Sequence, residues 1–333
     1  MRLLTLIGAA LGAGLTVWLL YRVGLDHVLA LLGSAGWGLL LLVGVHLMQM
    51  LLSGAGWRVV AGRADKPSVA AFVMLRWVRE AVGNLLPVAQ VGGEFVAVRL
   101  LARRRMSLVA AAACTVCDLT VELVTQILFT LIGLVTILAL LGPSRVTDAV
   151  VSGLGVACVA AFAFVAVQWL GVVGRMERVL GRLARRFNWP GIAEIGGLDQ
   201  AITGLYRAPR AMALAFCAHL AAWLLGTVEI WIALRVLGHP AGLAEALVIE
   251  SLSQAIKVAG FMVPASLGVL EGGFVVIGTL FGLSPPLSIA LALLRRLREI
   301  AFGLPALAAW QWLEAGSAPR HRAPDRRPCG RPS

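Results

Sequence analysis

Long apolar runs separated by short polar stretches dominate the chain. A helix needs about 20 mainly apolar residues to cross a bilayer, and the runs predict about six spanning helices. The longest run must tilt to fit. The first run is long and lacks a clear cleavage site, so we interpret it as a retained span and not as a signal peptide. The runs cover residues 3–22, 36–57, 107–141, 149–171, 211–237 and 287–313.

Two further apolar stretches, 69–101 and 243–282, are interrupted in the same way. Each contains a proline, two adjacent glycines and a glutamate, and the proline-to-glutamate spacing is the same in both. Broken backbone at membrane depth is tolerated only where it is buried in protein or lines a cavity. We therefore predict two re-entrant hairpins that form a transport site. The segments read GNLLPVAQVGGEFVAVR from Gly83 to Arg99 and GFMVPASLGVLEGGF from Gly260 to Phe274.

Basic residues gather in four connections, at 58–66, 103–105, 172–210 and in the tail. Loops rich in Lys and Arg stay in the cytoplasm. One simple arrangement satisfies this rule for all four. Both termini are then cytoplasmic, the first hairpin enters from the cytoplasm, and the second enters from the outside.

An offset of 177 residues aligns the two halves without gaps. We predict an inverted-topology repeat, with repeat one at 36–141 and repeat two at 211–313. Chance matches between two apolar sequences are the alternative, although the loop arginines support opposite insertion independently. The aligned pairs are Arg58 with Arg235, Gly83 with Gly260, Pro87 with Pro264, Glu94 with Glu271, and Glu122 with Glu299.

Composition agrees with a polytopic membrane protein: 59% of residues are hydrophobic, mean hydropathy is +0.88 and 14% are charged. The fold class is thus all-α, with a single integral membrane domain over residues 1–315. The net charge of +12 favours contact with anionic lipid at the cytoplasmic face over nucleic-acid binding, because the arginines lie between apolar spans. The 172–210 linker is interpreted as an amphipathic interfacial helix, with a solvated linker as the alternative. The tail 316–333 is predicted to be disordered.

Cofactor chemistry finds little support in the sequence. Cys114 and Cys117 form one CxxC motif without a second pair or a histidine at ligand spacing, so no metal is predicted. The chain has no GxxxxGK[ST] motif for nucleotide. We expect no cofactor and no catalytic residue.

Charged residues inside the apolar runs carry the functional hypothesis, since a central charge costs about 2.5–3.5 kcal/mol and needs a partner or water. They predict a midplane polar cavity that holds a lipid headgroup. The alternative is that they only pair with one another, Arg295 with Asp118 or Glu122 first. His46 and His219 are interpreted as packed histidines with local hydrogen bonds, and Trp57 as an interfacial anchor. The candidate substrate-binding residues are Arg76, Arg79, Glu80, Asn84, Pro87, Gly92, Gly93, Glu94, Arg99, Asp118, Glu122, Lys257, Pro264, Glu271, Gly272, Gly273, Arg295, Arg296 and Glu299.

Two stretches resemble a known family. GNLLPVAQVGGEFVAVRLL (83–101), and PASLGVLEGGF (264–274) followed by LALLRRL (291–297), look like the signatures of the lysylphosphatidylglycerol synthase transmembrane region, or flippase-like, family. Length and plan are similar to its hopanoid-biosynthesis-associated (HpnL-type) branch. The chain stops soon after Leu313, where relatives with aminoacyl transfer activity carry a soluble domain. The resemblance therefore implies only lipid translocation.

Three functions remain open at this point. The first is a flippase of the bacterial inner membrane that moves a phospholipid or hopanoid-type lipid between leaflets. The second is a non-catalytic scaffold of a lipid biosynthesis complex. The third, a membrane enzyme acting on lipids, lacks a recognisable nucleophile or metal constellation. Homo-oligomers or biosynthetic partners are compatible with each of them.

Overall fold

The computed structural model describes residues 26, 30, 33, 36–62, 66–86, 92–104, 106–142, 197–259, 266 and 268–315. All elements in these ranges are helical, and none is a strand. The helices are α3 (Gly38–Val60), α4 (Val69–Leu85), α5 (Gly92–Ala102), α6 (Leu108–Leu141), α9 (Leu198–Tyr206), α10 (Pro209–Val236), α11 (Leu243–Ala259), α12 (Val269–Leu280) and α13 (Pro285–Ala315).

The helices fall where the apolar runs predict them. Four predicted spans coincide with α3, α6, α10 and α13, and the two interrupted stretches become the first helix pair (α4 and α5) and the second helix pair (α11 and α12). Within the described ranges, α3, α6 and α10 are long and apolar enough to cross a membrane. The runs 3–22 and 149–171, the linker up to residue 196 and the tail 316–333 lie outside the described residues.

Local signals set where helices begin and end. Ser68 Oγ accepts a hydrogen bond from the Ala71 backbone N–H at 3.2 Å, and Ser107 Oγ accepts one from Ala110 at 3.1 Å. These hydroxyls satisfy N–H groups that have no partner inside α4 and α6. At its far end α6 stops at Gly142, whose φ of +69° is unfavourable for residues with a Cβ.

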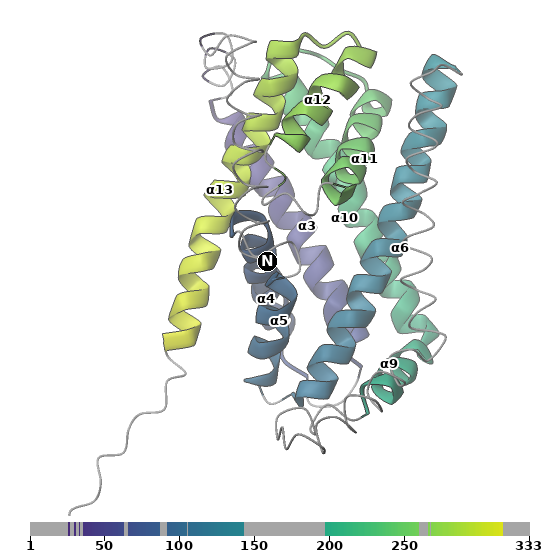
Figure 1. Cartoon of the computed structure of the whole chain (residues 1–333), viewed down its shortest axis with the longest axis vertical. Coiled ribbons are helices and arrows are strands. Elements are labelled where there is room, and N and C mark those ends of the chain that lie inside the picture. Colours follow the sequence, from purple (N-terminus) through teal and green to yellow (C-terminus); the bar gives the residue numbers. More distant parts are fainter. Residues whose placement is uncertain are drawn as a thin grey trace, which may run out of the picture.

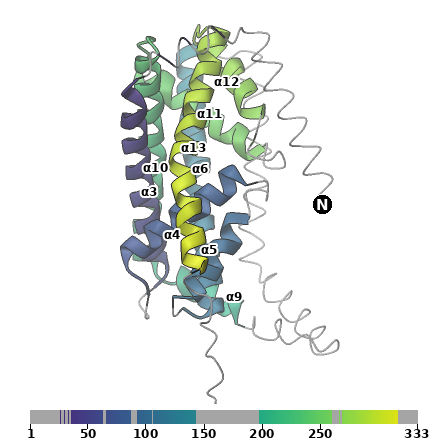
Figure 2. The same cartoon turned by 90° about the vertical axis from the view of Figure 1, so that its left-hand side faces the viewer.

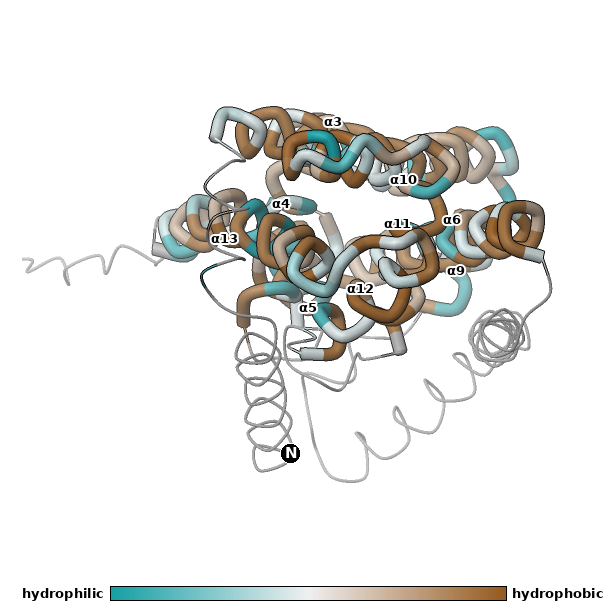
Figure 3. Tube along the Cα trace, turned by 90° about the horizontal axis from the view of Figure 1, so that it is seen from above, coloured by the Kyte–Doolittle hydropathy of each residue, from teal (hydrophilic) through white to brown (hydrophobic). Residues whose placement is uncertain are grey.

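The long helices enclose the two short pairs. In Figure 3, α3 and α10 lie side by side as one layer. The first helix pair occupies the lower half of Figure 1 and the second pair the upper half, with α13 and α6 along opposite sides (Figures 1 and 2). α6 packs against α11, and α13 packs against α4, so each long helix contacts a helix of the other half.

The distribution of buried and exposed side chains is the reverse of that in a soluble protein. Large apolar side chains face outward: Trp37 is 84% exposed, Phe95 75% and Val135 66%. Asp118 and His219, by contrast, are buried at 0% and 1% exposure. This distribution suits a protein whose outer surface contacts lipid and whose interior holds its polar groups.

Glycines let helices approach closely, which drives packing where lipid and core are equally apolar. A Cβ on Gly273 would lie 2.9 Å from a side-chain carbon of Ile256, and one on Gly54 would lie 2.7 Å from the Val73 Cα. Gly93 lies against the backbone of Arg79 in the same way. Gly93, which precedes Glu94, and Gly273, which lies two positions after Glu271, therefore hold the two helices of their pair together.

The expected interfacial role of Trp57 is wrong. Its side chain is fully buried, packs edge-on against Phe72 with ring centroids 5.1 Å apart, and lies under the Arg79 guanidinium at 5.4 Å. A large aromatic side chain near a span end can face the bundle as readily as the headgroups. Sequence position alone does not distinguish the two.

Candidate functional site

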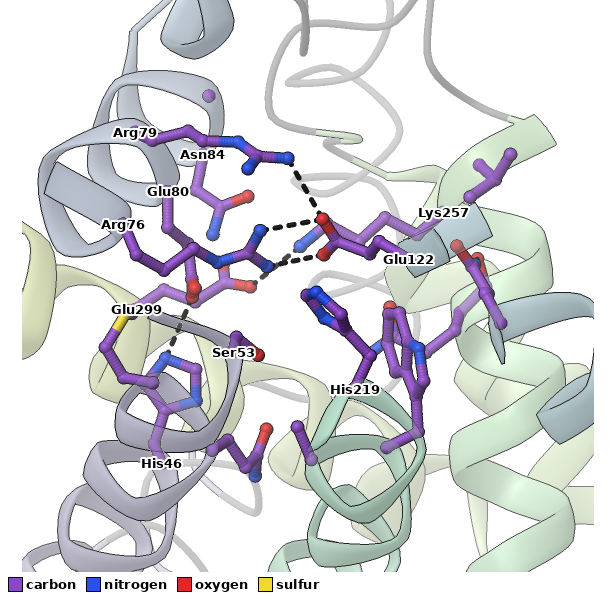
Figure 4. Close-up of a pocket in the computed structure, with 18 of the residues that line it drawn as sticks. His46, Ser53, Arg76, Arg79, Glu80, Asn84, Glu122, His219, Lys257 and Glu299 are labelled. Carbon is purple, nitrogen blue, oxygen red and sulfur yellow. Dashed lines mark hydrogen bonds and ion pairs between the residues drawn. The ribbon is translucent and has the colours of Figure 1, made fainter. Parts of the chain in front are cut away.

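A cavity of about 470 Å³ lies between the two helix pairs. Residues 46–53 of α3, 119–126 of α6, 219–223 of α10 and 295–299 of α13 contribute to its wall, and each range is near the middle of its helix. The middle of a spanning helix lies near the hydrocarbon centre. The cavity therefore lies at the level of the helix centres, and Figure 4 shows the polar side chains that point into it.

Helix ends meet at this depth. α4 ends at Leu85 and α11 at Ala259, while α5 begins at Gly92 and α12 at Val269. Glu94 and Glu271 occupy the first turns of α5 and α12, where the helix dipole favours a negative charge. Glu271 also accepts the Gly268 backbone N–H at 2.7 Å. The interrupted stretches thus place one carboxylate of each pair at the cavity level.

Arg79 is the centre of the first charged cluster. Its guanidinium donates to Glu94 at 2.7 Å, to Asp118 at 2.7 Å and to Glu122 at 3.0 Å. Arg76 binds the same Glu122 carboxylate with two nitrogens, one of them at 2.7 Å. Bidentate guanidinium–carboxylate contacts are strong and directional. They fix α4, α5 and α6 to one another at the cavity wall (Figure 4).

The second cluster connects α11, α12 and α13. Arg295 binds Glu250 with nitrogens at 2.6 and 3.3 Å. Arg296 donates to Glu271 at 3.0 Å and to Glu299 at 3.3 Å. Lys257 also reaches Glu299, at 3.3 Å. Each glutamate of the two aligned motifs, Glu94 and Glu271, is therefore held by an arginine.

A third cluster joins α3, α4, α10 and α13. His46 lies 2.8 Å from Glu80 through Nε2 and 2.6 Å from Arg298 through Nδ1. Arg298 also contacts Glu229 at 3.0 Å, and Gln49 donates to Glu229 at 2.9 Å. The cluster ties the α3–α10 layer to α13.

The expected pairing of Arg295 with Asp118 or Glu122 is wrong. Arg295 pairs with Glu250, whereas Asp118 and Glu122 are taken by arginines of α4. The side chains of the facing helices decide the pairing: Arg295 of α13 reaches Glu250 of α11 at 2.6 Å, and Arg76 and Arg79 of α4 bind the two acids of α6. Glu250 is absent from the sequence-based candidates. A carboxylate within an apolar stretch is itself a sign of a functional or paired residue, so Glu250 could have been included.

The structure brings most predicted site residues together. Nine line the cavity directly, Asp118 and Arg296 contact those that do, and Glu271 is bound by Arg296 one contact further away. Arg99 does not: it is an exposed residue that pairs with Glu314 at 3.2 Å. Pro87 and Pro264 lie outside the described residues, Gly92 begins α5, and Gly272 has open space around it. The nine lining residues are Arg76, Arg79, Glu80, Asn84, Glu94, Glu122, Lys257, Arg295 and Glu299.

Sequence reasoning missed several lining residues. His46 and His219 are cavity residues bonded to carboxylates across helices, where packing with local hydrogen bonds was expected. The uncharged polar residues at mid-depth went unnoticed because single amides and hydroxyls are common in membrane helices. They are Gln49, Ser53, Trp223, Gln126 and Gln254.

The family comparison covers both helix pairs and the cavity. A model described as the lysylphosphatidylglycerol synthase transmembrane region matches residues 5–306. No curated protein and no solved structure matches the chain. Together with the apolar helices, the match identifies a membrane protein related to lipid handling. The chain belongs to the family of the lysylphosphatidylglycerol synthase transmembrane region.

Proposed function

We propose that the protein is a lipid flippase of the bacterial inner membrane. The headgroup of a phospholipid or hopanoid-type lipid passes through the midplane cavity while its tails stay in the bilayer. The observation that carries this proposal is the cavity itself: seven helices, α3, α4, α5, α6, α10, α11 and α13, direct polar side chains into one space at hydrocarbon depth. Such a cavity is costly to maintain and marks a substrate pathway.

An inverted repeat supports alternating access. Moved by 177 residues, the starts of α5 and α6 at Gly92 and Leu108 fall on Val269 and Pro285, where α12 and α13 begin. The packing is reciprocal as well, since α6 contacts the second pair and α13 the first. Each helix pair also occupies only one half of the molecule's height (Figure 1), as a re-entrant hairpin does. We infer that the two pairs are oppositely inserted gates.

The distribution of charge supports cytoplasmic termini. The C-terminal ends of α3 and α5, the N-terminal end of α6 and all of α9 lie at the lower end of Figure 1. The basic residues next to these ends support a cytoplasmic position for that side. They are Arg58, Lys66, Arg103, Arg104, Arg207 and Arg210.

The arginine–glutamate contacts of the two pairs give the gates a mechanism. Arg79 holds Glu94, and Arg296 holds Glu271. A phosphate headgroup can replace the carboxylate at the guanidinium, because each offers two oxygens that accept a pair of hydrogen bonds from arginine. Another headgroup with two such oxygens can do the same. Exchange at Arg79 would open the first pair, and exchange at Arg296 the second. No catalytic step is part of this proposal.

A scaffold is the second candidate, and one observation favours it. In the three charged clusters every arginine is engaged by a carboxylate, so pairing could serve stability alone. A scaffold does not need the carboxylates to exchange partners. Neutralising Glu94 and Glu271 in a protein that stays folded therefore separates the two functions.

The test is leaflet exchange in liposomes. Purified protein is reconstituted with a labelled anionic phospholipid or, separately, a labelled hopanoid, and the outer-leaflet label is quenched chemically. We expect wild type to expose inner-leaflet label and the Glu94→Gln/Glu271→Gln variant to lose that activity. Glu245→Gln is the matched control, because Glu245 lies at the start of α11 and, among the described residues, bonds only the Gly242 N–H. Activity of the double variant equal to wild type would overturn the gate mechanism, and no exchange of either lipid by wild type would favour the scaffold.

A further inference from the structure

The three clusters contain more carboxylates than cations. Eight buried or half-buried acidic side chains and six basic ones are joined by contacts within 4.0 Å or through His46. Charge in a low-dielectric interior is tolerated best when it is balanced. Two histidines contact this network, so they are the groups that can bring the balance closer to neutral. The acids are Glu80, Glu94, Asp118, Glu122, Glu229, Glu250, Glu271 and Glu299, and the bases are Arg76, Arg79, Lys257, Arg295, Arg296 and Arg298.

Both ring nitrogens of His46 are engaged. An arginine is always charged and can only donate, so the 2.6 Å contact from Arg298 requires a lone pair on His46 Nδ1. The other ring nitrogen, Nε2, then carries its hydrogen and donates to Glu80 at 2.8 Å. Glu229 also lies 3.7 Å from Nδ1. Neither ring nitrogen of His46 is therefore left for a hydrogen bond to cavity water.

His219 has the opposite environment. Its Nε2 lies 2.8 Å from Asp118, whose other oxygen accepts from Arg79. Because Asp118 accepts from Arg79 as well, we assign the hydrogen between Asp118 and His219 to His219 Nε2. Nδ1 makes no hydrogen bond in the part of the chain that the structure describes, and the residue lines the cavity. This nitrogen is free to take a proton from cavity water, and the charge gained lies beside a carboxylate.

A short chain of contacts leads from His219 to the first helix pair. Asp118 is shared between His219 at 2.8 Å and Arg79 at 2.7 Å, and Arg79 also holds Glu94 at 2.7 Å. A proton on His219 strengthens the attraction between His219 and Asp118, and it weakens the hydrogen bond that Arg79 donates to Asp118. The guanidinium is then freer to leave Glu94 for a headgroup. Protonation on one side of the membrane is in this way connected to the gate.

We propose that His219, paired with Asp118, is the proton-binding site of this protein, and that one proton is taken up and released for each lipid moved. The inference rests on the proposed flippase function, because it names the energy source of that same cavity. On one side of the membrane the N–H bond at Nδ1 forms as an O–H bond of hydronium breaks, and on the other side the proton returns to water in the reverse step.

Several charged groups surround this site. α6 contributes two acids, α4 two bases and one acid, α5 one acid, and α11 and α13 groups across the cavity. α3 contributes His46 and carries Arg58 two positions beyond Gly56, which packs near the His219 ring. The groups on the helices other than α3 are Asp118, Glu122, Arg76, Arg79, Glu80, Glu94, Lys257, Arg295, Arg298 and Glu299.

The coupling is tested by the final distribution of lipid and not by its rate. Wild-type protein is reconstituted with a labelled lipid whose headgroup does not titrate, under a gradient of one pH unit with the membrane potential clamped. One proton per lipid predicts about tenfold enrichment in one leaflet. His219→Gln should give equal leaflets, whereas His46→Gln should keep the enrichment ratio even if its rate changes. If wild type moves lipid but leaves equal amounts in the two leaflets, the proton inference is wrong and the flippase proposal still holds. If wild type moves no lipid, the flippase proposal is wrong as well.

Discussion

Gly93 lies so close to Arg79 that a Cβ at position 93 would overlap the Arg79 carbonyl oxygen. The residue that follows this glycine, Glu94, is the one that binds the Arg79 guanidinium at 2.7 Å. Backbone contact and ion pair thus lie side by side at one point between α4 and α5. Because Gly93 has no side chain, α4 and α5 can come close enough to form the salt bridge between Arg79 and Glu94.

Substituting Gly93→Ala should therefore separate α4 from α5. The added methyl group meets backbone atoms, which cannot rotate away, so we expect a loss of about 1–3 kcal/mol, as for overpacking in a tight core. Gly272→Ala is the control, because nothing lies within 4 Å of the added carbon. Thermal unfolding of both variants in detergent should show a lower midpoint for the first only. Equal midpoints would contradict the close approach.

Loss of Arg79 should be the most damaging single change in the first cluster. Arg79→Gln leaves Glu94 and Asp118 without their cation, and breaking a buried pair by removing one partner costs about 3–5 kcal/mol. Adding Asp118→Asn removes one of the stranded charges and should recover part of the loss. Unfolding by a denaturing detergent measures both. An Arg79→Gln protein as stable as wild type would argue against this network.

The Glu250–Arg295 pair can be distinguished from the pairing that the sequence suggested. Glu250→Gln and Arg295→Gln should each destabilise the protein, and the double variant should be more stable than the sum of the two losses implies. The coupling between Arg295 and Asp118 should be near zero in the same assay. A double-mutant cycle that finds coupling to Asp118 but none to Glu250 would contradict the observed contacts.

Opposite insertion of the helix pairs predicts opposite labelling. In a protein whose five cysteines are replaced by alanine, Arg103→Cys after α5 should react only with a reagent supplied from the cytoplasm. Leu243→Cys, which is 56% exposed at the start of α11, should react only from outside. Reaction of both sites from the same side would rule out the inverted topology.

The sequence predicts the elements well because local rules decide them. Apolar run length, the capping Ser68 and Ser107, and the glycines around Glu94 and Glu271 act within a few residues. Each of these signals places a helix end without reference to the rest of the fold. The positions of α4, α5, α11 and α12 follow from them.

Partner choice inside the cavity could not be predicted in the same way. The sequence offered Asp118 and Glu122 as partners for Arg295, and only the tertiary structure shows that its guanidinium binds Glu250 instead. His219 differs from a packed histidine only through Asp118, which lies 101 positions away in sequence. The cavity's charges are known from sequence, but their pairing is a property of the tertiary arrangement.

The central claim is that a headgroup passes through the cavity, and filling the cavity tests it most directly. Ser53 lines the cavity and is 6% exposed, whereas Val135 is 66% exposed on the outer surface. Leaflet exchange should be measured in liposomes for wild type, Ser53→Trp and Val135→Trp, each checked for folding. We predict that Ser53→Trp falls to the rate of protein-free liposomes and that Val135→Trp matches wild type. A folded Ser53→Trp protein with the wild-type rate would contradict passage through this cavity.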